Sequence, residues 1–227
     1  MSESPSDRLR VVTIGGGTGS SVLLTGLNEY ADRLHISAIV TTFDDGGSSG
    51  KLRQQFGIPA LGDIRRCIAA LLPKSANQQD VRDRFEFRFE HATNFKGHAY
   101  GNLLLLFAIL RHGGLSNAIN ELTSALCLNG LVIPASEEPS NLSAKLKDGT
   151  VIKGETNIDN HTNTPSSIDR IYLDPPVTAN PEALNAIRSA HAIVLGPGDL
   201  FTSVVPNLLP TGMTHAIQSS QAKVIQI

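Results

Sequence analysis

The sequence predicts an α/β fold, a three-layer, doubly wound and mostly parallel sheet with a small β-hairpin insertion. Short apolar runs alternate with segments of helical apolar spacing along most of the chain, a pattern typical of β-α-β units. Glycine-rich loops follow apolar runs at Gly15–Gly19, Gly46–Gly50 and Gly196–Gly198. In a doubly wound sheet, such loops join strands to helices at the edge where ligands bind.

The spacing of apolar residues predicts the individual elements. The expected strands are Arg10–Ile14, His35–Phe43, Leu131–Ile133, Ile168–Leu173, Ala192–Leu195 and Ala222–Ile227. The expected helices are Val22–Tyr30, Gly62–Leu72, Asn77–Glu90, His98–His112, Ser116–Leu126, Pro181–Ala190 and Thr202–Leu209. The hairpin is expected at Leu142–Leu146 and Val151–Glu155, and a polar loop at Asn157–Ser167.

The chain of 227 residues is expected to form one domain over residues 10–227. Residues 1–9 open with a polar, acidic stretch that lacks the order of a signal peptide and is expected to be a disordered tail. The run Ala222–Ile227 would be either a short edge strand or the cut end of a larger sheet. We favour a C-terminally truncated chain.

Composition excludes several classes of partner. The net charge of −2 gives no electrostatic case for nucleic acid or for an anionic membrane. No apolar stretch reaches the roughly 18 residues of a membrane span. Cys67 and Cys127 lie far apart in apolar helical patterns, so both are expected to be buried free thiols in a reducing cytoplasm.

The first glycine-rich loop carries four glycines in five residues: Gly15, Gly16, Gly17 and Gly19, with Thr18 between them. Glycine lets successive amides point inward as an anion site, and the following helix N-terminus adds a positive end. A tight turn alone also needs glycine, but the neighbouring hydroxyls favour a phosphate. The loop is not a dinucleotide fingerprint, because Ser20 or Val22 stands where the third glycine is required.

The second loop begins with the paired acids Asp44 and Asp45 and continues through Gly46, Gly47 and Ser48. One acid is expected to orient a ligand hydroxyl or to hold a divalent cation, and the other to cap the turn. Asp45 is the candidate metal ligand and Mg²⁺ the candidate ion. A P-loop is excluded, because its first glycine would fall at Asp45 and its Ser/Thr at Leu52.

Two arginines at the start of a predicted helix oppose its dipole. We therefore expect Arg65 or Arg66 to face an anionic ligand or a carboxylate such as Asp44. Asp63 precedes them as a candidate ligand residue, and the alternative is a plain helix N-cap.

His98 and Asn102 lie four residues apart, so they are expected on one face at the N-terminus of the most apolar helix. His98 would be a phosphate ligand or proton donor, and the alternative is a packing histidine. The third glycine loop contributes Gly196, Pro197 and Gly198, followed by Thr202, as a second wall of the cleft.

These segments, in this order, resemble the gluconeogenesis factor family, a YvcK/CofD-like group that includes 2-phospho-L-lactate transferase. The matching segments are Ile14–Gly19, Asp44–Gly50, Gly62–Arg65, Gly97–His98, Gly101–Leu103, Gly154–Glu155, Gly196–Gly198, Thr202–Ser203 and Pro206–Leu208. The resemblance spans residues 10–227. Asp199 stands where the family usually has serine, so either a cation lies beside it or its loop turns away.

The resemblance implies a Rossmann-like fold with a nucleotide-binding cleft. One branch of the family binds UDP-sugars and supports cell-wall growth and cell shape on gluconeogenic carbon. The run Gly46–Gly50 after the paired acids resembles that branch. In the transferase branch, a phospholactyl group moves from a guanosine diphosphate donor to a hydroxyl in the presence of magnesium, and Asp44 and Asp45 would be catalytic.

We therefore expect a cytoplasmic nucleotide-sugar-binding factor, with Mg²⁺-dependent transfer of a phosphorus-linked group as the alternative. An NAD-dependent oxidoreductase is disfavoured by the missing fingerprint. A homodimer is a reasonable expectation for this fold.

Overall fold

Five parallel strands form the central sheet, in the order β3-β2-β1-β7-β8. The structure is a computed structural model that describes residues 8–74, 78–91, 94–163 and 166–227. The strands are β1 (Leu9–Gly15), β2 (Leu34–Val40), β3 (Gly130–Pro134), β7 (Ala192–Leu195) and β8 (Lys223–Gln226). Strands β2 and β3, which follow β1 in the chain, lie on one side of β1 in the sheet, whereas β7 and β8 lie on its other side. The carboxyl ends of β1 and β7 therefore flank a topological switch point, where doubly wound sheets bind ligands.

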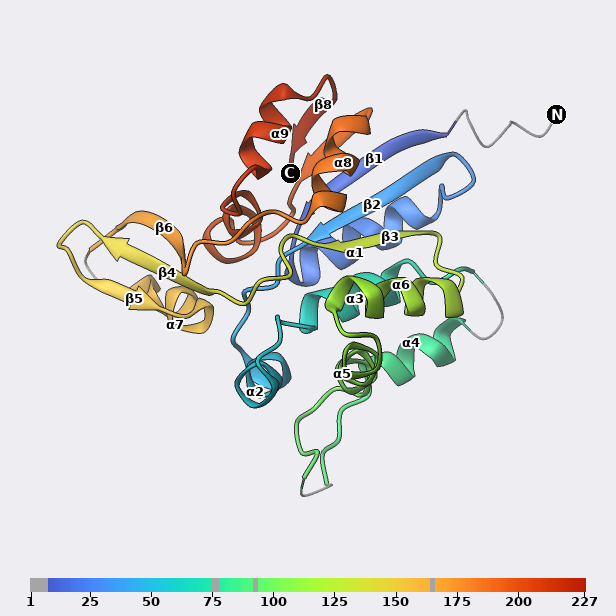
Figure 1. Cartoon of the computed structure of the whole chain (residues 1–227), viewed down its shortest axis with the longest axis horizontal. Helices are drawn as coiled ribbons and strands as arrows, with labels where there is room; N and C mark the ends of the chain where they lie inside the picture. Colours follow the sequence, from blue (N-terminus) through green and yellow to red (C-terminus); the bar gives the residue numbers. More distant parts are fainter. Residues whose placement is uncertain (1–7, 75–77, 92–93, 164–165) are drawn as a thin grey trace.

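Helices cover both faces of this sheet (Figure 1). One group comprises α1 (Gly17–Asn28), α2 (Gly47–Phe56), α3 (Gly62–Ala70), α4 (Gln78–Glu86), α5 (Tyr100–His112) and α6 (Leu115–Ala125), and the other α8 (Pro181–Ser189) and α9 (Met213–Ser219). Side chains alternate between the faces along β2. Ala38 joins the core under the first group, whereas Ile39 joins the core under α8 and α9. The predicted three-layer, doubly wound architecture is confirmed.

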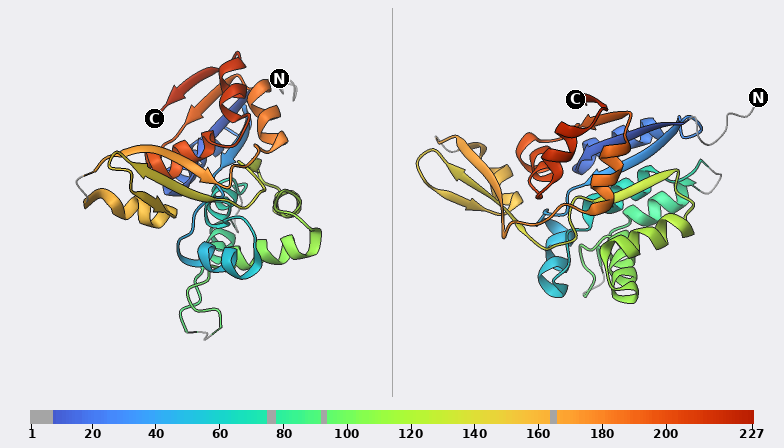
Figure 2. Two further views of the ribbon diagram at one scale, coloured as in Figure 1. Left: turned by 60° about the vertical axis from the view of Figure 1, so that its left-hand side comes forward. Right: turned by 45° about the horizontal axis from the view of Figure 1, so that its top comes forward.

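A small second lobe carries an antiparallel sheet in the order β5-β4-β6 (Figure 2). Its elements are β4 (Asn141–Leu146), β5 (Val151–Lys153), α7 (Glu155–Asp159), the 3₁₀ turn η2 (Asn160–Asn163) and β6 (Ile168–Asp174). Phe43, just after β2, is buried in the core of this lobe with Leu142 and Ile171. The insertion is thus larger than the predicted hairpin, because β6 pairs with β4.

Helix boundaries differ from the expectation at several points. Helix α2 begins inside the second glycine-rich loop and was not predicted. The helix expected over Asn77–Glu90 ends at Glu86, and Asn77 lies outside the described residues. Beyond Glu86, Arg88 forms a β-bridge with Ala99, so the chain doubles back as a ribbon.

Three further segments differ. The expected loop at Asn157–Ser167 contains the end of α7 and η2, while residues 164–165 lie outside the described part. The helix expected at Thr202–Leu209 is a π-helical turn, η3 (Leu200–Val204), followed by the 3₁₀ turn η4 (Val205–Leu208). Strand β1 begins at Leu9, inside the predicted tail, of which residues 1–7 are not described.

The two cysteines differ in burial. Cys67 is buried in α3 as predicted, but the prediction for Cys127 is wrong because its side chain is exposed. Cys127 follows α6 in a left-handed turn with φ of 51°, which carries it out of the apolar face of the helix.

No single helix among the described residues is both long and apolar enough to cross a membrane. Helices α5 and α6 reach the length and apolar composition of a membrane span only when they are taken as one pair, and that pair is bent by 114°. Both helices contribute buried residues to the core beneath the sheet.

Candidate functional site

A polar pocket of about 250 Å³ lies beyond the carboxyl end of β2 and beside the start of α1. Its lining comes from the large domain and from α7 of the small lobe. The lining residues are Gly17, Asp44, Gly46, Gly47, Ser48, Ser49, Gly62, Asp63, Arg65, Arg66, Arg88, Asn102, Glu155 and Ser203. We call this the main pocket.

Three helices begin at the main pocket. Gly17, Gly47 and Gly62 are the first residues of α1, α2 and α3, and all three line it. The first N–H groups of a helix have no partner within the helix, and the helix dipole makes this end positive. Three such ends facing one pocket of this size favour a phosphate or another anion.

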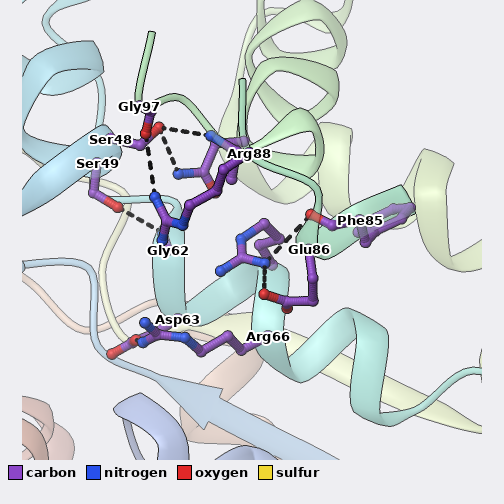
Figure 3. A network of polar contacts seen from close by, with 12 residues as sticks. Ser48, Ser49, Gly62, Asp63, Arg66, Phe85, Glu86, Arg88 and Gly97 are labelled. Carbon is purple, nitrogen blue, oxygen red and sulfur yellow. Dashed lines mark hydrogen bonds and ion pairs between the residues drawn. The ribbon is translucent and has the colours of Figure 1, made fainter. Parts of the chain in front are cut away.

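Three arginines, Arg65, Arg66 and Arg88, line the same pocket. Figure 3 labels Arg66 and Arg88 and shows the polar contacts around them. Arg65 forms an ion pair with Glu86, and its Nη1 donates a hydrogen bond to the Phe85 carbonyl at 3.3 Å. Arg66 Nη1 donates to Asp63 Oδ1 at 2.9 Å. The carboxylates that face Arg65 and Arg66 are therefore Glu86 and Asp63, not Asp44.

Arg88 is the arginine whose charge remains uncompensated. Its Nη1 donates to the Gly97 carbonyl at 3.2 Å, and within the described residues no carboxylate lies in ion-pair distance of its guanidinium. The sequence predicted Arg88 within a helix over Asn77–Glu90. The chain reversal after Glu86 takes it out of that helix, and its exposed side chain lines the main pocket.

Asp63 is buried, with 7% of its surface exposed. Burial raises the pKa of its carboxyl, while Arg66 and the Gly17 N–H, which donates a hydrogen bond to it, oppose that rise. The N-cap alternative is wrong, because Leu61 occupies the N-cap of α3. A Cβ at Gly16 would lie 2.6 Å from Asp63 Oδ2, so glycine at this position lets the loop reach the carboxylate.

Asp44, Asp45 and Glu155 form a carboxylate cluster, of which Asp44 and Glu155 line the pocket. One oxygen of each lies within 4.8 Å of the others. Burial, and then the negative charges of Asp44, Asp159, Asp45 and Asp63, raise the pKa of Glu155 to about 8. Carboxylate oxygens are the ligands that Mg²⁺ prefers, and a cation here would relieve this accumulated charge. The residues thus fit the predicted Mg²⁺ site.

The two aspartates also have structural partners. Asp44 Oδ1 accepts a hydrogen bond from the Gly46 N–H at 2.7 Å, which confirms the predicted turn cap. Asp45 Oδ1 accepts hydrogen bonds from the Thr156 N–H at 2.9 Å and from its hydroxyl at 2.8 Å. Asp45 therefore holds the start of α7, and with it Glu155, against the main pocket.

Ser48 contacts both His98 and Asn102 through its hydroxyl. Ser48 Oγ accepts a hydrogen bond from Asn102 Nδ2 at 3.1 Å and lies 3.1 Å from His98 Nδ1. His98 precedes α5, so it does not share a helical face with Asn102 as predicted. Burial, and then Lys51, lower the pKa of His98, which favours the neutral imidazole beside Ser48.

Glycines of the first and third glycine-rich loops allow close contacts between neighbouring segments of the chain. A Cβ at Gly19 would lie 2.6 Å from the Pro197 carbonyl oxygen, and one at Gly198 would lie 2.8 Å from Ser203 Cβ. The first and third glycine loops therefore pack against each other. Asp199 caps η3, where its Oδ1 accepts a hydrogen bond from the Thr202 hydroxyl at 3.0 Å.

About half of the predicted ligand residues line the main pocket. Those that do are Gly17, Asp44, Gly46, Gly47, Ser48, Asp63, Arg65 and Asn102. Those that do not line it are Gly15, Gly16, Thr18, Gly19, Asp45, His98, Gly196, Pro197, Gly198 and Thr202. Lining residues not predicted as ligands are Ser49, Gly62, Arg88, Glu155 and Ser203, whereas Arg66 was the alternative to Arg65. Most of these adjoin a predicted residue, whereas no sequence signal marked Arg88.

A family model described as "2-phospho-L-lactate transferase CofD" matches residues 11–227. The chain belongs to the CofD family. The resemblance expected from the sequence is thereby confirmed.

Several curated relatives within the CofD family share the name "Gluconeogenesis factor". The relative from Halalkalibacterium halodurans is 42% identical over 218 residues, which cover 96% of this chain and 65% of the relative. The relative from Bacillus subtilis is 39% identical over 219 residues, covering 96% and 67%. This chain thus spans about two thirds of the length of these relatives.

A crystal structure of a Bacillus halodurans protein, described as a member of the upf0052 family, is similar to this CofD-family chain. The TM-score is 0.89 at 40% sequence identity, over 96% of this chain and 68% of that one. This likeness confirms the α/β fold.

Proposed function

We propose that this CofD-family chain is a gluconeogenesis factor that binds a nucleotide-sugar of the UDP-sugar type. The names of its relatives support the gluconeogenesis role. The observation that carries the ligand class is the convergence of three helix N-termini and Arg88 on one pocket. In the cell, the protein would act in the cytoplasm and support envelope growth and cell shape on gluconeogenic carbon.

The diphosphate of the ligand would occupy the positive half of the main pocket. The Gly17 and Gly62 N–H groups already donate to Asp63 and to Ser49 Oγ, so the Gly47 N–H and the other N–H groups in the first turns of α1, α2 and α3 would donate to its oxygens. Arg88 would balance its charge. Asn102 and Ser48 would orient the group next to the phosphate. The carboxylate cluster would hold Mg²⁺ or accept hydrogen bonds from ligand hydroxyls.

A thermal-shift panel tests this proposal. The ligands are UDP-N-acetylglucosamine, UDP-glucose, UDP, GDP and NAD, each with and without magnesium. A ligand at 100 times its dissociation constant adds about 2.7 kcal/mol to the free energy of unfolding. We expect the UDP-sugars to raise the melting temperature more than GDP or NAD, and no response to any UDP compound would overturn the proposal.

Arg88→Ala tests the observation that carries the proposal. Losing a charge-assisted hydrogen bond to phosphate should weaken UDP-sugar binding by roughly 10-fold or more. Arg84→Ala is the matched control, because Arg84 does not line the main pocket. Its exposed guanidinium forms an ion pair with Asp80, also in α4, at 2.7 Å. Equal affinities of the two variants would exclude Arg88 from the site.

The second candidate function is Mg²⁺-dependent transfer of a phosphorus-linked group. The carboxylate cluster favours it, because its oxygens could hold Mg²⁺ and one of the aspartates could take a proton from an acceptor hydroxyl. Arg88 and the helix N-termini would then stabilise the charge on the departing phosphate. We expect stabilisation by GDP only with magnesium in this case, and loss of turnover in Asp45→Asn. Turnover that survives the removal of magnesium would exclude it.

A further inference from the structure

A cavity of about 330 Å³ is lined by three helices, α1, α3 and α4. Its volume is within the range of small-molecule sites. Ala69 and Ala70 of α3 leave room there, because they carry no side-chain atom beyond Cβ. The remaining lining residues are polar or charged, and they are Thr18, Ser21, Thr25, Arg66, Arg82 and Glu86. We call this cavity the helix pocket.

Arg82 gives the helix pocket a positive charge that no carboxylate balances. Its Nε is buried, and among the described residues it has no hydrogen-bond partner. Within the same part of the chain, no carboxylate lies in ion-pair distance of its guanidinium, whereas the nearby Arg84 pairs with Asp80. A buried donor without an acceptor is unfavourable, so an anion in this cavity would supply what Arg82 lacks.

Arg66 is the second cation of the helix pocket, and it lines the main pocket as well. Its Nη1 donates to Asp63 Oδ1, but a guanidinium carries five N–H donors, so others stay free for a ligand. The side chain is 35% exposed, which leaves it accessible from the cavity. Arg66 and Arg82 come from different helices, and an oxyanion is the group that two guanidinium ions can bind together.

The α1 wall of the helix pocket offers hydrogen-bond acceptors. Thr18, Ser21 and Thr25 are three and four residues apart, so they share one face of the helix. The Ser21 hydroxyl donates to the Thr18 carbonyl at 2.8 Å, and the Thr25 hydroxyl donates to the Ser21 carbonyl at 2.9 Å. Because each hydroxyl has only one proton, these two oxygens can only accept from a ligand, as can the ionised carboxylate of Glu86. A ligand that satisfies both walls carries hydroxyl donors as well as an oxyanion.

We propose that the helix pocket binds a small polyhydroxylated oxyanion, a sugar phosphate or a sugar acid, at a site separate from the main pocket. Arg82 and Arg66 hold the anionic group, and the hydroxyls of the ligand donate to Ser21, Thr25 and Glu86. This inference goes beyond the proposed function and does not depend on it. The lining of the main pocket includes neither Arg82 nor the α1 hydroxyls.

Calorimetric titration of the whole chain tests this site. The probes are glucose 6-phosphate, glucuronate, glucose and inorganic phosphate. We expect the tighter of glucose 6-phosphate and glucuronate to bind roughly 10-fold or more tightly than glucose or inorganic phosphate, because only the first two combine an oxyanion with hydroxyl donors. Comparing these two probes distinguishes a sugar phosphate from a sugar acid.

Two variants test the two walls of the helix pocket. Arg82→Met keeps an unbranched apolar chain but removes the guanidinium, so it should weaken binding of the tighter probe roughly 10-fold or more. Arg84→Met is the matched control, because Arg84 lies two residues further along α4 and does not line this pocket. Ser21→Ala removes an acceptor for ligand hydroxyls, so it should weaken the tighter probe and leave the affinity for inorganic phosphate unchanged.

The outcomes also separate the helix pocket from the main pocket. Arg88→Ala should weaken the binding of UDP but not that of the tighter sugar probe, because Arg88 lines only the main pocket of the two. Failure of both glucose 6-phosphate and glucuronate to bind, or equal affinities of Arg82→Met and Arg84→Met, would overturn the inference. An equal loss of the sugar probe in Arg88→Ala and Arg82→Met would place that probe in the main pocket and overturn it too. Absence of UDP binding alone counts against the proposed function and leaves the helix pocket intact.

Discussion

Asp45 accepts two hydrogen bonds from Thr156, a residue 111 positions further along the chain. Asp45 follows β2 of the central sheet, and Thr156 lies in the first turn of α7 in the small lobe. The contact joins the loop after β2 to α7 of the small lobe. It also positions the neighbouring Glu155 beside Asp44 and Asp45, where the carboxylate cluster forms.

The Thr156 hydroxyl should contribute measurably to stability. Thr156→Val removes the hydroxyl donor and keeps the backbone N–H, so we expect a loss of about 1 kcal/mol in the free energy of unfolding. Urea denaturation measures it. Thr25→Val is the control, because Thr25 is exposed and its hydroxyl donates to the Ser21 carbonyl within α1 itself, at 2.9 Å. Equal losses would show that the Asp45 contact adds no stability.

A side chain at Gly154 should destabilise the protein for two reasons, its left-handed backbone conformation and a collision with Asp45. Its φ is 94°, and an added Cβ would lie 2.2 Å from Asp45 Oδ2. Gly149 has a φ of 91° and nothing within 4 Å of the same position, so Gly149→Ala measures the backbone strain alone. We expect Gly154→Ala to lower the free energy of unfolding by about 1–3 kcal/mol more than Gly149→Ala. Similar melting temperatures for the two variants would contradict the collision.

Glu155 should make the ligand-free protein less stable as pH rises. Its pKa is raised to about 8 from an ordinary value of 4.5, so between these values the unfolded chain loses a proton that the folded chain keeps. Stability attributable to Glu155 is therefore present at pH 4.5 and lost as pH approaches 8. We expect Glu155→Gln to raise the melting temperature most at pH 8.5, with a smaller gain at pH 5.5.

The control for that measurement is Asp148→Asn. Asp148 is an exposed acid whose pKa is lowered by hydrogen bonds from Thr150, so its charge is favourable in the folded chain. This variant should not become more stable at high pH. A pH-independent gain in Glu155→Gln would show that Glu155 is ionised in the folded protein.

The two cysteines should differ in reactivity towards thiol reagents. Burial raises the pKa of the Cys67 thiol well above its ordinary value, so almost no thiolate forms there in the folded state. Cys127 is exposed. We expect one label per folded chain, lost in Cys127→Ser, and two labels in denaturant. Two labels on the folded protein would contradict the burial of Cys67.

Much of the fold could be predicted from local pattern. Strands such as Ala192–Leu195 are short apolar runs bounded by turn residues, and Pro181 marks the start of α8, where its missing N–H costs nothing. The predictions failed where local signals compete. Glycine and serine in the second loop indicate a turn, yet α2 forms there because its buried residues, including Leu52, pack in the core.

The sequence by itself determined the fold class, the family and the set of loops that surround the main pocket. The fold class follows from apolar periodicity, the loops from glycines and acids at the ends of strands, and the family from a resemblance of short motifs in order, all of which are local in the chain. Only the tertiary structure decided how the charges pair. Arg65 pairs with Glu86, Asp45 holds Thr156, and Arg88 turns to the pocket, because each geometry depends on segments brought together by folding. A linear pattern shows which side chains are charged, and the packing decides which of them remain available for a ligand.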